Sequence, residues 1–299
     1  MKTHIRHLAL AVFLTAVVVQ AAPDIYFGED LSPYPYPAPN DVPRPASIPN
    51  TERAASAFAS RLPGILSETF EGLATASKPT LIAFGTNAAA LAGNYEILTV
   101  LDPTNTFGGI FPISGTNVLI LRAEQASFFS LEFSSPQGAF GFYGTDFGEP
   151  TGMWLRVIAA SGTTNTVSVP ITRPQGSGAS FFFGIIEKTN PFVRIEFHPT
   201  GTEFDWFGFD NMTIATPEQV HPAPAVLDIA LASGNRSAME IGISGTVGAT
   251  YRLEYTTTLP ATAWMALTNM TLPVPRGLFL DGEALTNDAK RFYRAVTIE

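Results

Sequence analysis

The stretch from residue 181 to residue 214 constrains the fold of this chain more than any other part of its sequence. It holds three aromatic-rich runs separated by short polar turns. In the run 192–198, apolar residues alternate with a second set made of Phe192, Arg194, Glu196 and His198. A period of two with one apolar face and one mostly polar face is typical of a half-buried strand. The stretch therefore predicts the closing strands of a β-sandwich.

The β pattern begins near Glu68 and predicts a larger domain over residues 66–215. Its expected strands are 81–84, 95–101, 117–121, 128–133, 139–145, 153–159, 166–169, 181–187, 192–198 and 207–214. Gly, Pro, Asn and Ser fill the connections, as turns require. Many short strands without intervening helices predict an all-β, jelly-roll-like sandwich.

A Pro-bearing segment, residues 216–224, is predicted to link this domain to a smaller one over residues 225–299. The expected strands there are 226–231, 238–244, 250–256, 264–268, 278–281 and 291–298. Their number and length indicate an immunoglobulin-like or fibronectin type III-like sandwich. Tyr251, Leu253 and Tyr255 should share one face, and Trp264 should fill the core.

The N-terminus carries the pattern of a secretory signal over residues 1–22. Basic residues precede an apolar run, and small residues that suit signal cleavage lie before Pro23. The run is too short to span a bilayer, so no membrane span is expected after cleavage. Residues 23–65 should form a Pro-rich arm, with neither a helix nor a central strand before residue 50, followed by a short helix. Asn50 or Thr51 is the expected helix cap.

Composition excludes some functions. The formal net charge is −9, and no cluster of Lys and Arg stands out. Nucleic acid is therefore an unexpected partner, because phosphate binding needs clustered positive charge. The chain has no cysteine, so an exported protein of this kind must be stabilised by its core rather than by disulfides.

Two parts of the chain resemble exported bacterial proteins. The run 251–256, with Trp264 and the closing residues 292–295, resembles the C-terminal β-sandwich module of exported proteins from Verrucomicrobia-like bacteria. Residues 25–31, 139–146 and 209–211 resemble exported β-sandwich proteins of the PEP-CTERM type. The sorting signal of that type is not expected here, because the last residues lack an apolar helix and a basic tail.

The larger domain also resembles MAM-like and carbohydrate-binding jelly rolls, through Phe70-Glu71 at its start and residues 209–211 at its end. In those folds the first and last strands lie side by side and can hold a structural calcium ion. The resemblance implies Glu71, Asp210 and Asp146 as candidate ligands, since Ca²⁺ prefers oxygen donors. The alternative is that these acids lie at solvated strand ends.

Aromatic residues flanked by carboxylates suggest a site for a polysaccharide or a cell-surface glycan. Glu203, Asp205 and Trp206 lie within one short stretch, and Tyr143 would extend the site if it faced the same side. The alternative for Trp206 is a place in the core.

Catalysis has less support, because after cleavage the histidines are His198 and His221 and no Cys nucleophile exists. A noncatalytic exported binding protein is thus predicted, secreted or at the cell surface. The alternatives are a polysaccharide hydrolase that uses a carboxylate pair, drawn from Glu196, Glu203, Asp205 and Asp146, and a structural envelope protein.

Overall fold

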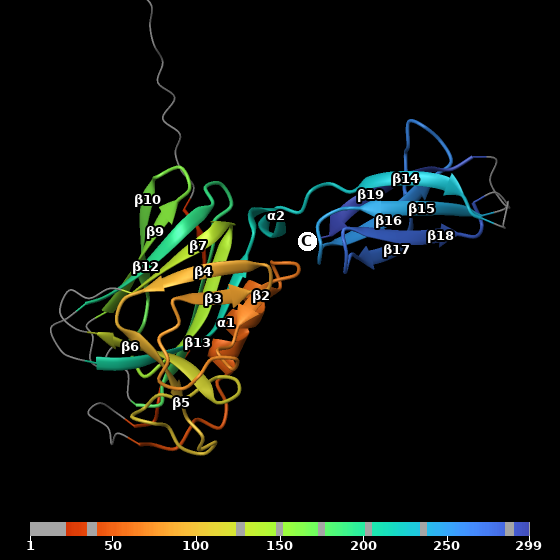
Figure 1. The fold of residues 1–299 in the computed structure, drawn as a ribbon. Coiled ribbons are helices and arrows are strands. Elements are labelled where there is room, and N and C mark those ends of the chain that lie inside the picture. Colours follow the sequence, from red (N-terminus) through yellow and green to blue (C-terminus); the bar gives the residue numbers. More distant parts are fainter. Residues whose placement is uncertain are drawn as a thin grey trace, which may run out of the picture.

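The computed structural model describes residues 22–34, 41–123, 129–147, 152–172, 177–200, 205–233, 238–284 and 290–298. Nearly all of the predicted signal peptide lies outside these residues. The chain forms a larger and a smaller β lobe joined near a short helix, α2 (Pro217–Val220) (Figure 1). The prediction of an all-β chain with two sandwiches is confirmed. No helix within the described residues is long and apolar enough to cross a membrane.

Two antiparallel sheets build the larger domain. The strands of the first sheet are, in spatial order, β1 (Asp24–Asp30), β11 (Ser180–Ile186), β8 (Ala139–Thr145), β13 (Asp205–Ala215), β6 (Asn117–Ala123) and β5 (Tyr95–Thr99), with β2 (Leu66–Glu68) paired to β13. Those of the second sheet are β10 (Thr164–Val169), β9 (Gly152–Ala159), β12 (Phe192–Thr200), β7 (Phe129–Gln137), β4 (Asn87–Ala92) and β3 (Leu81–Phe84). The pairing of β2 with β13 places the start of the predicted domain beside its end.

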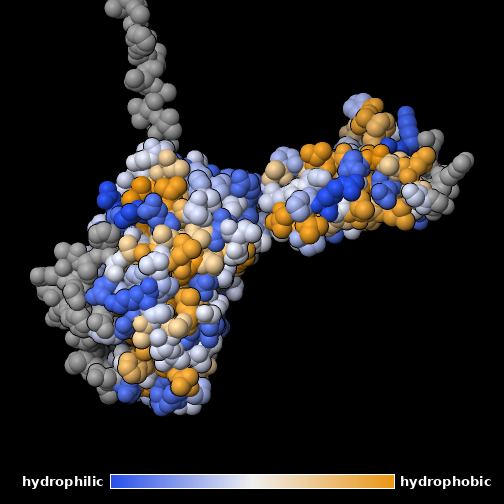
Figure 2. All heavy atoms as spheres, viewed as in Figure 1, coloured by the Kyte–Doolittle hydropathy of each residue, from blue (hydrophilic) through white to orange (hydrophobic). Residues whose placement is uncertain are grey.

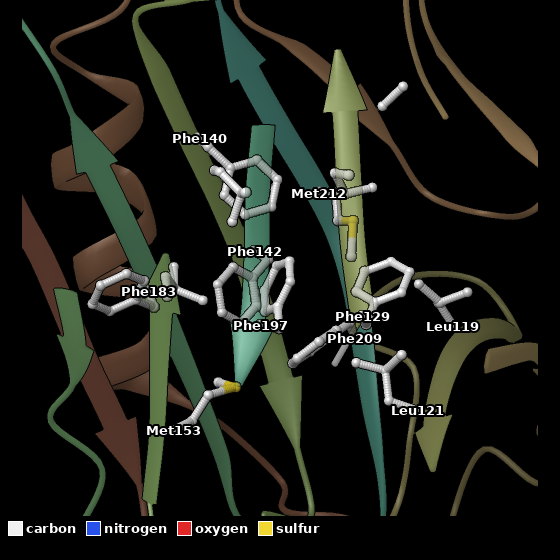
Figure 3. Close-up of a cluster of buried hydrophobic side chains, with 14 of the residues drawn as sticks. Leu119, Leu121, Phe129, Phe140, Phe142, Met153, Phe183, Phe197, Phe209 and Met212 are labelled. Carbon is white, nitrogen blue, oxygen red and sulfur yellow. The ribbon is translucent and has the colours of Figure 1, made fainter. Parts of the chain in front are cut away.

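Phenylalanine rings from both sheets fill the space between them (Figure 3). Phe142 on β8 is fully buried at the centre, with its ring centroid 4.8 Å from that of Phe209 and 5.3 Å from that of Phe197. Phe209 belongs to the first sheet and Phe197 to the second. Edge-on contacts of this kind add to the hydrophobic gain of burial, so Phe142 links the two layers.

One residue of the stretch that opened the sequence analysis faces the other way from its prediction. Phe192 was expected on the polar face of its strand, with Arg194, but it is fully buried. The register of β12 shifts between Phe192 and Arg194 against both neighbouring strands. A β-bulge adds a residue and so reverses the faces. The alternation holds from Arg194 onward, where Ile195 and Phe197 are buried.

The predicted Pro-rich arm is wrong at its start. Residues 24–30 form β1, which pairs along its whole length with β11. This segment contains no proline, and its position at the sheet edge leaves one side of its backbone without a strand partner. Periodicity alone could not show that it joins the larger domain.

The predicted short helix is confirmed as α1 (Pro49–Ala59), which buries Ala54, Ala55 and Phe58 on the outer face of the first sheet. Glycines make room for it. A Cβ added at Gly184 would come within 2.7 Å of the Phe58 ring, and one at Gly141 within 3.0 Å. Close approach of this kind explains why a strand tolerates glycine.

The predicted cap of this helix is wrong. The N-cap residue is Ile48, which has no side-chain capping bond. Instead, the Asp30 carboxylate at the end of β1 accepts hydrogen bonds from the backbone N–H groups of Asn50 (3.1 Å) and Thr51 (2.9 Å). A carboxylate at a helix N-terminus satisfies unpaired donors and complements the helix dipole. The first strand therefore holds the helix in place.

The smaller domain is a sandwich of two three-stranded sheets. One has the order β14 (Val226–Leu231), β15 (Met239–Ser244) and β18 (Arg276–Asp281), and the other β17 (Met265–Thr271), β16 (Thr250–Thr256) and β19 (Phe292–Ile298). Of the three residues predicted to share one face, Tyr251 and Leu253 are fully buried and Tyr255 is half-buried. Trp264 does not fill the core. It is half-buried, with the Arg294 guanidinium 4.3 Å from its ring centroid.

Hydrogen bonds and close packing hold the predicted linker against both domains. Gln219 on α2 is buried, and its side-chain amide donates to the carbonyl oxygens of Pro63 (2.8 Å) and Gly64. On the side of the smaller domain, Gly248 lies against the same turn, where an added Cβ would come 2.4 Å from the Gly64 nitrogen. The Tyr251 hydroxyl donates to the carbonyl oxygen of Ala223 (2.9 Å). Both domains therefore contact the linker through buried polar groups.

Candidate functional site

A groove of about 440 Å³ lies on the outer face of the first sheet, beside α1. Parts of the chain that are distant in sequence form it: α1 with the turn that follows, β2 with Thr69, the loop that carries Ser114, and the neighbouring strands β8, β11 and β13. Its lining residues are Ala55, Ser56, Phe58, Ala59, Ile65, Ser67, Thr69, Ser114, Tyr143, Phe182, Asn211 and Thr213. This volume falls within the range found for small-molecule sites.

One side of the groove is aromatic. Tyr143 is half-buried and meets the Phe182 ring edge-on, with the ring centroids 5.1 Å apart. Phe182 in turn contacts Phe58 of α1 at 5.4 Å. Burial raises the pKa of the Tyr143 phenol, and the negative charges of Glu52 and Asp210 raise it further. The phenol therefore stays protonated and able to donate a hydrogen bond.

Short polar side chains form the other side. The hydroxyls of Ser67 and Thr213 lie 3.0 Å apart, and the Ser114 hydroxyl donates to the Asn211 side-chain oxygen at 2.7 Å. The Asn211 side-chain nitrogen has no hydrogen-bond partner among the described residues. The wall therefore presents hydroxyl groups and one free amide donor to whatever enters the groove.

A β-bulge in β13 shapes this wall. The register between β13 and β8 shifts between Asp210 and Thr213, and Asn211 adopts a positive φ of 46°. Asn is among the few residues that tolerate this left-handed conformation. Bulges re-aim side chains and are frequent next to functional sites, and here the bulge brings Asn211 and Thr213 to the same groove.

Asp210 lies beneath the polar wall. It is almost fully buried, and its carboxylate accepts hydrogen bonds from the backbone N–H groups of Ile113 (2.7 Å), Ser114 (3.0 Å) and Asn211 (2.7 Å). Burial raises its pKa to about 7, although these three donors lower it in part, and the nearby charge of Glu71 adds to the rise. Asp210 therefore positions Ser114 and Asn211 without facing the groove itself.

Of the other two predicted calcium ligands, Glu71 also binds backbone groups. Glu71 is exposed and accepts from the N–H groups of Thr116 (2.9 Å) and Asn117 (2.7 Å), next to the segment that Asp210 holds. Asp146 is buried, and its carboxylate lies against Gly109. The three carboxylates do not form one cluster, since the described part of the chain contains no group of three acidic or histidine side chains placed to hold a metal ion. Calcium binding itself stays a prediction.

The predicted ligand-binding residues separate in the structure. Tyr143 lines the groove, whereas Trp206 is half-buried and packs on another cluster, formed by Val100, Ile110, Val118 and Ile120. Trp206 therefore lies at the edge of a packed cluster, and its role in ligand binding stays a prediction. Asp205 begins β13, but its side chain lies outside the described part of the chain, as does the whole of Glu203.

One candidate carboxylate for hydrolysis, Glu196, lies on the outer face of the second sheet. Its carboxylate is 3.0 Å from the Arg194 Nε and 3.5 Å from the Arg156 Nη1, and His198 approaches it at 3.2 Å. The His198 ring stacks on Trp154 at 3.9 Å. Glu196 is therefore held by two guanidinium groups in a cluster of charged side chains on this face.

Sequence reasoning missed most of the groove. Ser67, Thr69, Ser114 and Thr213 are isolated hydroxyl residues in segments that pair or pack only in the folded chain. The one usable signal was the sequence Asp210-Asn211 inside an otherwise apolar strand, where polar residues with a tendency to left-handed backbone indicate a bulge.

No protein-family model matches the sequence, and no curated protein matches it. Among solved structures, the K2 cleaved adhesin domain of Lys-gingipain aligns over 51% of this chain and 98% of its own, at 10% identity and a TM-score of 0.32. The N-terminal CBM22-1-CBM22-2 tandem domain of Xyn10C from Paenibacillus barcinonensis aligns over 79% and 91%, at 11% identity and 0.31. The adhesin domain of Epf from Streptococcus pyogenes aligns over 80% and 98%, at 8% identity and 0.25. Similarity at this level carries no argument about function.

Proposed function

We propose that this chain is an exported, noncatalytic protein that binds a neutral saccharide in the groove beside α1. The observation that carries the proposal is the pairing of two unlike walls in one concave site. The ring of Tyr143 and the apolar side of α1 face a row of hydroxyl groups and the free amide of Asn211. The predicted secretory signal supports export.

The chemistry of a sugar matches both walls. A pyranose ring has an apolar face of C–H groups, which packs on an aromatic ring, and a rim of hydroxyl groups, which exchange hydrogen bonds with Ser, Thr and Asn. Small-molecule sites are typically mostly apolar, with a few polar groups that fix the orientation of the ligand. The phenol of Tyr143 adds a donor at the aromatic side.

The electrostatics favour a neutral ligand. Among the described residues that line the groove none is Lys, Arg or His, so these residues offer no partner for a carboxylate or sulfate group. Glu52 and Asp210 act on Tyr143 as negative charges. An acidic sugar would therefore lose hydration without gaining an ion pair, which is costly.

The same composition argues against hydrolysis. Glycoside hydrolysis needs two carboxyl groups on either side of the scissile bond, and the groove is lined by neither Asp nor Glu. Asp210 is the nearest candidate, but three backbone donors occupy its carboxylate beneath the wall.

Affinity electrophoresis with the purified chain tests the proposal. Laminarin, galactomannan and hydroxyethyl cellulose supply neutral polysaccharides, and alginate and polygalacturonate supply acidic ones. We expect at least one neutral polysaccharide to retard the chain and the acidic ones to leave its mobility unchanged. Retardation by acidic polysaccharides alone, or by none of a broad panel, would overturn the proposal.

A further inference from the structure

We propose that β14 of the smaller domain pairs with β14 of a second copy of this chain, joining the two sheets across a two-fold axis. β14 is an edge strand of its sheet, and within the described part of the chain β15 is the strand that bonds to it. Three of its apolar residues are exposed: Val226 (69%), Ile229 (46%) and Leu231 (60%). Figure 2 shows hydrophobic residues over much of the visible face of the smaller lobe.

The free backbone groups of β14 can be identified. The pairing of β14 with β15 continues one residue beyond Leu231, where Ala232 lies opposite Ala238. The N–H of Ala232 donates to the carbonyl oxygen of Ala238, so this is a hydrogen-bonded pair. Hydrogen-bonded and non-bonded pairs alternate along an antiparallel ladder. Residues 226, 228 and 230 therefore bond to β15, while Leu227, Ile229 and Leu231 direct their N–H and C=O groups to the open edge.

The same three residues carry the apolar side chains of the inner face. Leu227 packs on the core of the smaller domain, and Ile229 and Leu231 continue that row but stay half-exposed or exposed. A strand with unpaired backbone groups and apolar side chains is a template for pairing with another chain, unless Lys, Pro or a bulge protects it. β14 contains no Lys and no Pro.

Charge selects one register. If β14 paired with its copy about Asp228, two carboxylates would lie directly opposite each other, which is unfavourable. Pairing about Ile229 places Ile229 opposite Ile229 of the copy, Leu227 opposite Leu231, and Asp228 opposite Ala230. This register uses all of the free backbone groups and avoids the repulsion. A strand that complements itself in this way produces a closed two-fold dimer.

Such a dimer would carry two grooves, one on each larger domain. A polysaccharide with repeating units could then occupy both, and the second binding event would be intramolecular. The inference does not depend on the proposed saccharide, because dimerisation is measured without any ligand.

Cysteine cross-linking tests the register directly, since the chain has no cysteine of its own. Residues opposite each other in a hydrogen-bonded pair have Cα atoms about 5.5 Å apart, within the range of a disulfide. Mild oxidation of Ile229→Cys should therefore give a covalent dimer. The matched control is Ala230→Cys, one residue further along the strand. In the proposed register residue 230 lies opposite Asp228 of the second copy, so this variant should form little covalent dimer.

Light scattering of the full chain tests the assembly. We expect the unaltered chain to be a dimer, and Ile229→Lys and Ile229→Pro to be monomers. The control is Leu280→Lys, which alters an exposed apolar residue on β18 and should leave the chain a dimer. Proline at position 229 removes only an N–H that points away from β15, so the fold should survive. A monomeric unaltered chain, or a dimer that persists in both Ile229 variants, would overturn the proposal.

Discussion

Replacement of Phe142 by alanine should lower the free energy of unfolding of the larger domain by about 4 kcal/mol. The side chain is fully buried between the two sheets and contacts rings on both, including Phe197 and Phe209. Truncation removes the transfer energy of the ring and leaves a cavity that the surrounding strands cannot fill, because regular backbone pairing holds them apart.

Urea unfolding measures this change, with the fluorescence of Trp154 and Trp206 as a probe of the larger domain. The control is Phe107→Ala, since Phe107 is 56% exposed and its loss should change the free energy by less than about 0.5 kcal/mol. Equal effects of the two substitutions would contradict the assignment of Phe142 to the centre of the core.

The second large effect is a pH dependence that originates at Asp210. Burial raises the pKa of this carboxyl from 3.8 to about 7, so between these values the folded chain holds a proton that the unfolded chain releases. Its contribution to stability is therefore complete below about pH 4 and is lost as the pH rises through 7. A pKa rise of this size corresponds to about 4 kcal/mol.

The difference in the free energy of unfolding between the unaltered chain and Asp210→Asn, measured as a function of pH, separates this contribution from that of the other acidic groups. Relative to the variant, the unaltered chain should become less stable as the pH is raised from about 5 to 8. Asp102→Asn serves as a control, because hydrogen bonds from Thr104 and Asn105 lower the pKa of exposed Asp102. Asp102 is therefore ionised in both the folded and the unfolded chain over this range, and its difference should not vary with pH. A difference that does not vary with pH would show that Asp210 titrates normally in the folded chain.

Most strands could be predicted because short runs of β-forming residues are separated by turn residues such as Gly, Pro, Asn and Ser. The predicted ranges 81–84, 139–145, 226–231 and 250–256 coincide with β3, β8, β14 and β16. Alternation fails where the backbone is irregular. Phe192 is the example, since one inserted residue turned it from the predicted polar face into the core.

Other errors arose from long-range pairing. β1 becomes a strand because β11 offers it an edge, and the α1 cap comes from Asp30 on that strand. Trp264 was placed in the core on residue type alone, but Arg294 of a neighbouring strand covers it at the surface. Such contacts join segments far apart in sequence, and no local pattern records them.

Of the residues that line the groove, one was named as a ligand-binding residue from the sequence. Tyr143 was named as a ligand-binding residue, and it lines the groove. Its predicted partner Trp206 has an equally suggestive sequence context but packs on a different cluster. The sequence reveals an aromatic residue on a strand; the neighbours that decide its role come from α1, β2 and the bulge in β13.

The central claim is that the ring of Tyr143 binds a saccharide, and calorimetric titration of matched variants tests it most directly. Tyr143 and Tyr26 are both half-buried and pack on the same cluster, Tyr143 against Phe182 and Tyr26 against Phe58. Only Tyr143 lines the groove. With the polysaccharide that retards the chain, Tyr143→Ala should weaken binding by about tenfold or more, while Tyr26→Ala leaves the affinity unchanged. Equal affinities of Tyr143→Ala and the unaltered chain would contradict the account.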